Sequence, residues 1–234
     1  MSNLSTAVLN QYLRIARSAL PTHCVLCGAR AADMGLCKPC AAGLPRLPKT
    51  LCATCALPLT SGSTCGACVA HPPRYDRVIA AFPYAFPIDA LVQAYKYRRD
   101  LSLAPLLAAQ LAPALRADVD AVIPMPLAPT RLRERGFNQA QELARHLGRA
   151  LRLPVLADAC RKVSDTAPQA ALPFGERARN VRGAFVCDAN LKGKRVAVVD
   201  DVMTTGATLN ELARNLKRAG AIHVSGWVVA RTLR

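Results

Sequence analysis

The chain has 234 residues, 10 of them cysteine, and a formal net charge of +16 from 31 basic and 15 acidic residues. This length accommodates one domain of ordinary size and a small module, and no stretch is long and apolar enough for a membrane span, so an integral membrane protein is not expected. The excess of positive charge favours anionic partners, either nucleic acid or small phosphorylated ligands.

Residues 1–20 are expected to form an amphipathic helix, because apolar side chains recur on one face at Leu4, Val8, Tyr12, Ile15 and Ala19. We expect this helix to pack on the rest of the chain, with binding to a membrane surface as the weaker alternative. The run contains no continuous apolar core of a secretion signal. We therefore expect a cytoplasmic protein, with peripheral association at the inner membrane left open.

Eight cysteines form four CxxC pairs, and a constant shift of 28 residues maps the first four onto the last four: Cys24, Cys27, Cys37 and Cys40, then Cys52, Cys55, Cys65 and Cys68. Four thiolates close a tetrahedral structural zinc site, so residues 21–72 are predicted to form a double zinc-ribbon module with two zinc ions. Grouping within each unit and interleaving between units both fit the spacing. A disulfide-bonded secreted module is the competing interpretation, and the missing secretion signal disfavours it.

Residues 73–234 alternate strand and helix patterns, which predicts an α/β domain with a mainly parallel sheet flanked by helices. Strands are expected at 77–86, 119–123, 196–199 and 223–230, and helices at 88–99, 101–116, 139–149 and from 204 onward. Residues 124–138 are expected to form a loop, and Asn138 is expected to cap the helix that follows. Cys160 and Cys187 lie outside the CxxC pattern and are interpreted as ordinary buried thiols.

The most informative segment joins the apolar run 196–199 to a helix. Asp200 and Asp201 fall at the carboxyl end of the strand, where parallel sheets bind ligands. The start of the next helix offers unpaired backbone N–H groups and threonine hydroxyls to an anion, while carboxylates accept hydrogen bonds from sugar hydroxyls. A ribose 5-phosphate fits both: Asp200 and Asp201 would hold the hydroxyls, and Met203, Thr204, Thr205, Gly206, Ala207 and Thr208 would hold the phosphate.

The sequence VAVVDDVMTTGATLNE, the segment 123–140, the stretch Tyr95-Lys96-Tyr97-Arg98 and the paired CxxC motifs together resemble the ComF family. This resemblance implies a type I phosphoribosyltransferase fused to a double zinc ribbon. It also implies binding of 5-phosphoribosyl 1-pyrophosphate (PRPP) with Mg²⁺, and roles in DNA uptake during natural competence or in the use of external DNA.

The same resemblance assigns residues to parts of the site. Asp200 and Asp201 would be the catalytic acids. Pro124, Met125, Pro126, Arg131 and Arg135 would face the pyrophosphate. Arg161, Lys162, Thr166, Gln169, Arg177 and Asn180 would belong to a flexible hood that closes over PRPP.

Two functions remain open at this point. One is a PRPP-dependent transferase. The other is a competence accessory protein that binds single-stranded DNA, works with a competence helicase or uptake proteins, and uses its transferase site only to sense PRPP or nucleotides. With five Phe, five Tyr and one Trp, the chain shows no evident pocket for a nucleobase.

Overall fold

A computed structural model of the chain describes residues 22–31, 35–116, 118–164 and 181–233. The expected helix over residues 1–20 and the hood residues Thr166, Gln169, Arg177 and Asn180 lie outside these ranges. The chain divides into two compact units, residues 1–44 and 45–234. This division falls between the two groups of four cysteines, whereas the boundary expected from sequence follows both of them.

The first unit contains two short strands and one short helix in its described part. Strand β1 (Thr22–His23) pairs antiparallel with β2 (Arg30–Ala31), and helix α2 (Lys38–Ala42) follows. Burial in this unit is concentrated at Cys24, Leu36, Cys37 and Leu44, two of which are cysteines of the first CxxC unit. An apolar core this small is typical of modules that a metal holds together.

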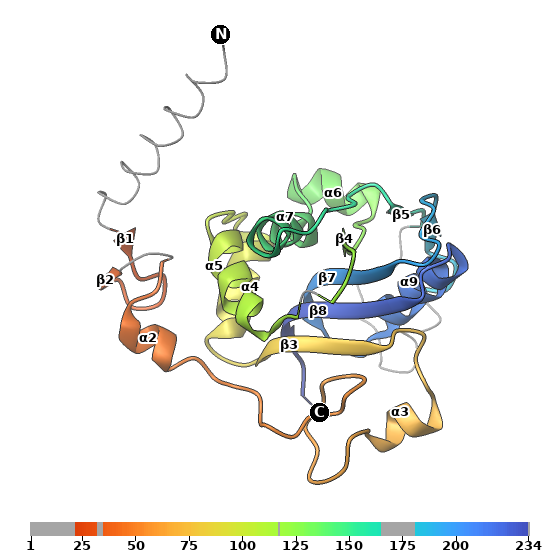
Figure 1. The fold of residues 1–234 in the computed structure, drawn as a ribbon. Helices are drawn as coiled ribbons and strands as arrows, with labels where there is room; N and C mark the ends of the chain where they lie inside the picture. The colour runs from red at the N-terminus through yellow and green to blue at the C-terminus, as the bar shows by residue number, and fades with distance from the viewer. Residues whose placement is uncertain (1–21, 32–34, 117, 165–180, 234) are drawn as a thin grey trace. The chain divides into compact units, whose positions relative to one another are not determined.

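The second unit begins with the second cysteine group and its helix α3 (Gly66–Ala70) and continues into a four-stranded sheet. The strands are β3 (Arg77–Pro83), β4 (Ala121–Pro124), β7 (Arg195–Met203) and β8 (His223–Arg231). Their order is β3-β8-β7-β4, and all three pairings are parallel (Figure 1). This confirms the predicted α/β class with a parallel sheet.

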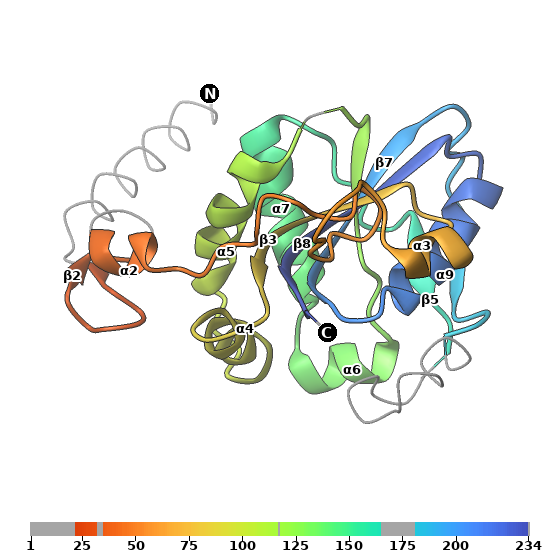
Figure 2. The ribbon, with the colours of Figure 1, turned by 90° about the horizontal axis from the view of Figure 1, so that it is seen from below.

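Helices cover both faces of this sheet. Helices α4 (Ile88–Tyr97), α5 (Leu103–Leu111) and α7 (Gln139–Leu151) lie on one side and α9 (Ala207–Arg218) on the other (Figures 1 and 2). Alternation along β7 divides its side chains between these layers, and Val196 and Val198 join the apolar cluster of α9. Cys52 and Cys55 of the second cysteine group belong to the same cluster, so this group packs as part of the α/β unit.

The structure differs from the sequence prediction in two places: the segment between β4 and α7, and the end of α5. Residues expected to form a loop instead form helix α6 (Pro129–Arg135), because Pro129 suits the first helical turn and Gly136, with φ of 80°, ends it in the left-handed conformation. The predicted helix 101–116 ends as α5 at Leu111 and continues as the short 3₁₀ turn η1 (Ala112–Ala114).

Cys160 and Cys187 form a disulfide, which corrects their interpretation as thiols. They occupy directly opposed positions of the antiparallel pair β5 (Cys160–Lys162) and β6 (Phe185–Cys187), with Cα atoms 4.2 Å apart. The sequence separation of 27 residues gives no hint of this register.

Candidate phosphate and metal sites

The eight CxxC cysteines form two separate tetrads, Cys24, Cys27, Cys37 and Cys40, and Cys52, Cys55, Cys65 and Cys68, each with sulfur atoms within 4.8 Å of one another. The Sγ atoms of Cys27 and Cys37 lie 3.7 Å apart, and those of Cys55 and Cys65 lie 3.6 Å apart. A tetrahedral zinc ion with Zn–S bonds of about 2.3 Å requires sulfur separations of about 3.8 Å. The tetrads therefore fit one zinc ion each, grouped within each unit rather than interleaved.

The repeat seen in the sequence is also a repeat of backbone geometry. The Cys24 N–H donates to the Ala29 carbonyl at 2.7 Å, and 28 residues later the Cys52 N–H donates to the Leu57 carbonyl at 2.8 Å. Helices α2 and α3 are related by the same shift of 28 residues. The sequence repeat therefore duplicates the folded backbone of a four-cysteine unit as well as its cysteine spacing.

The pKa values of the cysteine thiols differ strongly within each tetrad. Burial raises the pKa of Cys24 and Cys52. Hydrogen bonds from backbone N–H groups of the same tetrad, those of Cys37 and Cys65 first among them, outweigh burial and lower both pKa values to about 6. Hydrogen bonding to neighbouring thiols raises the pKa of Cys40, and burial together with such contacts raises that of Cys68. The thiols of each tetrad thus differ in how easily they ionise, and a divalent ion among the sulfur atoms would stabilise the full set of thiolates.

The turn between β7 and α9 has the geometry of an anion site. Gly206 lies in the left-handed region with φ of 82°, and a side chain there would collide with the Met203 side chain. The Asn210 N–H makes the first helical bond, to the Gly206 carbonyl at 2.8 Å, so earlier N–H groups of the turn have no helical acceptor. The Thr205 hydroxyl accepts from the Ala207 N–H at 3.2 Å.

The two acids at the end of β7 face different surroundings. Asp200 is half-buried and lines a cavity of about 50 Å³ together with Thr204, Gly206 and Thr208. Asp201 is 5% exposed, and its Oδ1 atom lies 2.8 Å from the Lys96 Nζ atom of α4. Because neighbouring residues of a strand point to opposite faces, only Asp200 shares the cavity with the turn.

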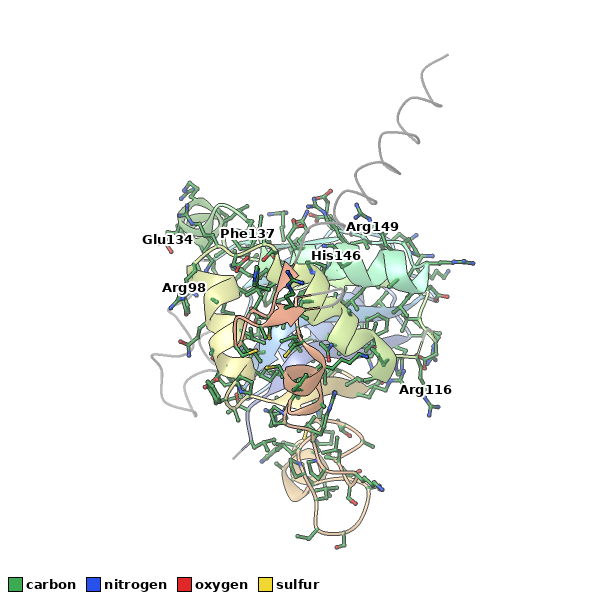
Figure 3. The ribbon with its side chains drawn as sticks, turned by 90° about the vertical axis from the view of Figure 1, so that its left-hand side faces the viewer. Arg98, Arg116, Glu134, Phe137, His146 and Arg149 are labelled. Carbon is green, nitrogen blue, oxygen red and sulfur yellow. A yellow bond between two sulfur atoms is a disulfide. The ribbon has the colours of Figure 1, made fainter. Side chains whose placement is uncertain are left out.

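One positive side chain contacts the acids and a second acts on them electrostatically. Burial opposes the charge of Lys96, but Asp201 outweighs this and raises the pKa of the ammonium above its ordinary value. The Arg135 guanidinium of α6 acts electrostatically on both Asp200 and Lys96, and it lies 5.5 Å from the centre of the Tyr97 ring. Figure 3 shows Arg98, from the end of α4, at the same edge as Glu134 of α6.

Comparison with known proteins supports the two-part organisation. The double zinc ribbon domain family matches residues 15–69, and the phosphoribosyl transferase domain family matches residues 132–231. A DNA utilization protein of Escherichia coli K12 is 35% identical over 92% of this chain and 99% of its own length. Competence protein F of Haemophilus influenzae is 33% identical over 89% of this chain and 96% of its own length, and competence protein ComFC of Bacillus subtilis is 24% identical over 86% and 85%. The chain belongs to the ComF family.

In this ComF chain the segment expected to face pyrophosphate lies beside the acids. Pro124 ends β4 opposite Val199 of β7, Met125 lines the cavity of Asp200, and Pro126 follows it. Arg131 and Arg135 are one helical turn apart on α6 and therefore share a face.

The described hood residues lie away from these groups. Arg161 forms an exposed ion pair with Asp188 at 3.1 Å, and the Lys162 ammonium lies 5.9 Å from the centre of the Phe185 ring. Neither interaction involves the acids of β7.

Two residues of this ComF chain were missed as candidates from sequence. Lys96 lies in a helix far from the acids in the chain, and Arg231 lies near the end of the last strand. The stretch 95–98 belongs to the family resemblance, and this was the available signal for Lys96. Arg231 carries no local signal, because its role depends on contacts that only the fold creates.

Proposed function

We propose that this chain binds PRPP together with Mg²⁺ at the carboxyl edge of the sheet. The observation that carries the proposal is the cavity in which the Asp200 carboxylate meets Thr204, Gly206 and Thr208 at the start of α9. The 5-phosphate would bind the N–H groups of the turn, and Asp200 would accept from a ribose hydroxyl. Mg²⁺ would be held mainly by ligand oxygens and water, with at most one or two carboxylates such as Asp200.

The second part of the proposal is a transfer reaction at the sugar. The bond between C1 and the pyrophosphate oxygen breaks, pyrophosphate leaves with the electron pair, and an acceptor nucleophile bonds to C1 and gives up its proton. Asp200 would lie on the sugar side, and above its raised pKa of about 7 its negative charge would stabilise the positive C1 centre. Lys96 and Arg135 carry positive charge next to the acids, which suits a departing pyrophosphate.

Isothermal titration calorimetry of the full chain with PRPP and MgCl₂ tests binding. We expect Asp200→Asn to weaken PRPP binding by about 10-fold or more, since a hydrogen bond to a charged group contributes about 1.5–3 kcal/mol. The matched control is Asp158→Asn, which removes an exposed carboxylate elsewhere in the unit. Absence of any heat with PRPP would refute the proposal. A screen of nucleobases for pyrophosphate release then tests the transfer step.

A second candidate function is binding of single-stranded DNA, with the PRPP site acting as a sensor. It is favoured by Tyr97, which is 70% exposed at the end of α4 and whose ring lies next to the Arg135 guanidinium. Exposed aromatic rings stack nucleobases, and arginines beside them bind phosphates. Arg98 and Arg99 continue this exposed basic surface.

Fluorescence anisotropy with a labelled oligo-dT strand tests this second function. The logarithm of the affinity should fall with the logarithm of salt concentration with a slope of about −0.7 per neutralised phosphate. Tyr97→Ala should cost about 1–3 kcal/mol if one base stacks there. The control is Phe86→Ala, because Phe86 is 79% exposed at the opposite end of α4. Equal losses in both variants would argue against a specific stacking site.

The cellular role is proposed from the relatives. Names such as DNA utilization protein and competence protein support a role in DNA uptake or in the use of external DNA. A competence helicase or other uptake proteins are the partners that we propose for this role. A cytoplasmic location is proposed because the eight tetrad thiols must stay reduced to bind metal, and the Cys160–Cys187 disulfide is then an exception to the usual state of cytoplasmic cysteines. Within the described ranges no helix is both long and apolar enough to cross a bilayer. Cell fractionation separates a cytoplasmic pool from peripheral attachment at the inner membrane.

A further inference from the structure

Arg231 connects the second cysteine tetrad to the phosphate turn. Its side chain is 1% exposed, and its Nε atom donates to the Cys55 carbonyl at 2.9 Å. Its Nη1 atom donates to the Met203 carbonyl at 3.0 Å, to the Thr204 carbonyl, and to the Thr232 carbonyl at 2.9 Å. One guanidinium therefore holds the backbone of a metal-ligating cysteine and the backbone of the turn at the same time.

These contacts determine where the N–H groups of the turn point. In a planar trans peptide the C=O and N–H bonds point in opposite directions. Because Arg231 binds the carbonyls of Met203 and Thr204, the N–H groups of Thr204 and Thr205 point away from the guanidinium. Those are two of the donors that the proposed phosphate needs, so Arg231 acts as a positioning residue for the turn.

The charge of a zinc-loaded tetrad would stabilise the Arg231 guanidinium beside it. A zinc ion with four thiolates carries a net charge of about −2, and buried cations are stabilised by such a neighbour. The tetrad and the turn also line one cavity of about 310 Å³, to which Cys65 and Cys68 contribute from one side and Thr205 and Gly206 from the other. Loss of zinc would remove both the fixed Cys55 carbonyl and the negative charge that favours Arg231 at this position.

We propose that zinc in the second tetrad controls the phosphate turn through Arg231, so that loss of this zinc disorders the turn and lowers its affinity for phosphorylated ligands. The statement about affinity rests on the proposed PRPP function, whereas the statement about order of the turn does not. The first tetrad belongs to the other compact unit, so zinc there is not expected to have this effect.

Hydrogen–deuterium exchange of the full chain tests the order of the turn. The variants are Cys68→Ser and Cys40→Ser, which occupy equivalent positions of the repeat and are both half-buried, and Arg231→Lys, which keeps the charge and loses the planar fork. We expect amide exchange at Thr232 and Asn210, whose N–H groups donate to the Met203 and Gly206 carbonyls of the turn, to rise about 5-fold or more in Cys68→Ser and Arg231→Lys and to stay unchanged in Cys40→Ser. Zinc content measured with a metal-sensitive dye confirms that each cysteine variant has lost one ion and that Arg231→Lys retains two.

The outcomes separate this inference from the proposed function. Unchanged exchange in Cys68→Ser, or an equal rise in Cys40→Ser, overturns the inference. If Cys68→Ser does not fold, the Arg231→Lys variant provides the test, because unchanged exchange in Arg231→Lys also overturns the inference. If PRPP fails to bind the wild type while the exchange pattern appears as expected, the proposed function fails and the structural coupling stands. If PRPP does bind, reciprocity of coupling requires that saturating PRPP tighten zinc binding by Cys40→Ser, in which the second tetrad is the intact one, and the zinc retained at equilibrium with a chelator measures this.

Discussion

The Lys96 ammonium of α4 lies 2.8 Å from the Asp201 carboxylate of β7, while the adjacent Asp200 faces the turn before α9. The two consecutive acids therefore have different environments. Asp201 is neutralised by a cation and 5% exposed, whereas Asp200 remains available in the cavity. Lys96 stabilises the end of the strand, and its charge also acts on Asp200.

We predict that Lys96→Met destabilises the protein, because it leaves the Asp201 carboxylate buried without its cation. Removing one partner of a buried ion pair costs about 3–5 kcal/mol, and the partial exposure of Lys96 places the expected loss near the lower end. Urea unfolding of the zinc-loaded protein measures it. Lys96→Met combined with Asp201→Asn should recover most of the loss, since no isolated charge remains. A double variant no more stable than Lys96→Met would show that the two residues are not energetically coupled.

A second prediction concerns the pH dependence of stability. Burial and the neighbouring Asp201 charge raise the pKa of Asp200 from 3.8 to about 7, although Lys96 and Arg135 oppose the shift. Between these two values the folded chain binds more protons than the unfolded chain, so the free energy of unfolding falls as pH rises. Asp200→Asn should be more stable than the ligand-free wild type at pH 8, and this difference should shrink toward pH 5.

Urea unfolding of both proteins at several pH values measures that difference, and the subtraction removes the contribution of the zinc sites, which both proteins share. The matched variant Asp158→Asn should show no such trend. A stability difference between Asp200→Asn and the wild type that is independent of pH would contradict the raised pKa of Asp200.

The elements that local sequence determines were predictable, and those that depend on distant contacts were not. The run of valines before Asp200, the threonine-rich turn and the spacing of the CxxC pairs each carry their signal within a few residues, and the cap at Asn138 is confirmed by its 3.0 Å bond from the Ala140 N–H. Helix α6 was missed because Pro129 and Gly136 were interpreted as loop residues rather than as helix ends. The pairing of Lys96 with Asp201 joins residues that are adjacent only in the folded sheet, so no local pattern encodes it.

A third prediction separates two roles of Asn138. Its Oδ1 atom caps α7, and its Nδ2 atom donates to the Met125 carbonyl at 3.1 Å, which holds the segment that lines the cavity of Asp200. Asn138→Ala should cost about 1 kcal/mol of stability through loss of the cap. Asn138→Ser keeps a capping hydroxyl and should recover most of that stability without restoring the bond to Met125.

Thermal unfolding and PRPP titration of both Asn138 variants provide the readouts. We expect the serine variant to unfold close to the wild type and to bind PRPP as weakly as the alanine variant. Wild-type PRPP affinity in Asn138→Ser would show that the bond to Met125 does not position the site.

The fourth prediction is that Gly206→Ala damages the turn more than left-handed strain alone explains. An alanine at φ of 82° costs about 1–2 kcal/mol through its backbone conformation. Its Cβ atom would also lie 2.5 Å from the Met203 Cε atom and 3.0 Å from the Tyr75 hydroxyl, so the turn must shift. Gly193→Ala is the matched control, because Gly193 has φ of 74° and a methyl group added there would meet nothing within 4 Å.

Chemical unfolding should therefore show a larger loss for Gly206→Ala than for Gly193→Ala, and the difference reports the collision with Met203 and Tyr75. PRPP affinity should fall in Gly206→Ala alone, because a shifted turn moves the N–H donors away from the phosphate. Equal losses of stability in the two variants would mean that Met203 and Tyr75 rearrange freely. Retained PRPP binding in Gly206→Ala would place the phosphate away from this turn.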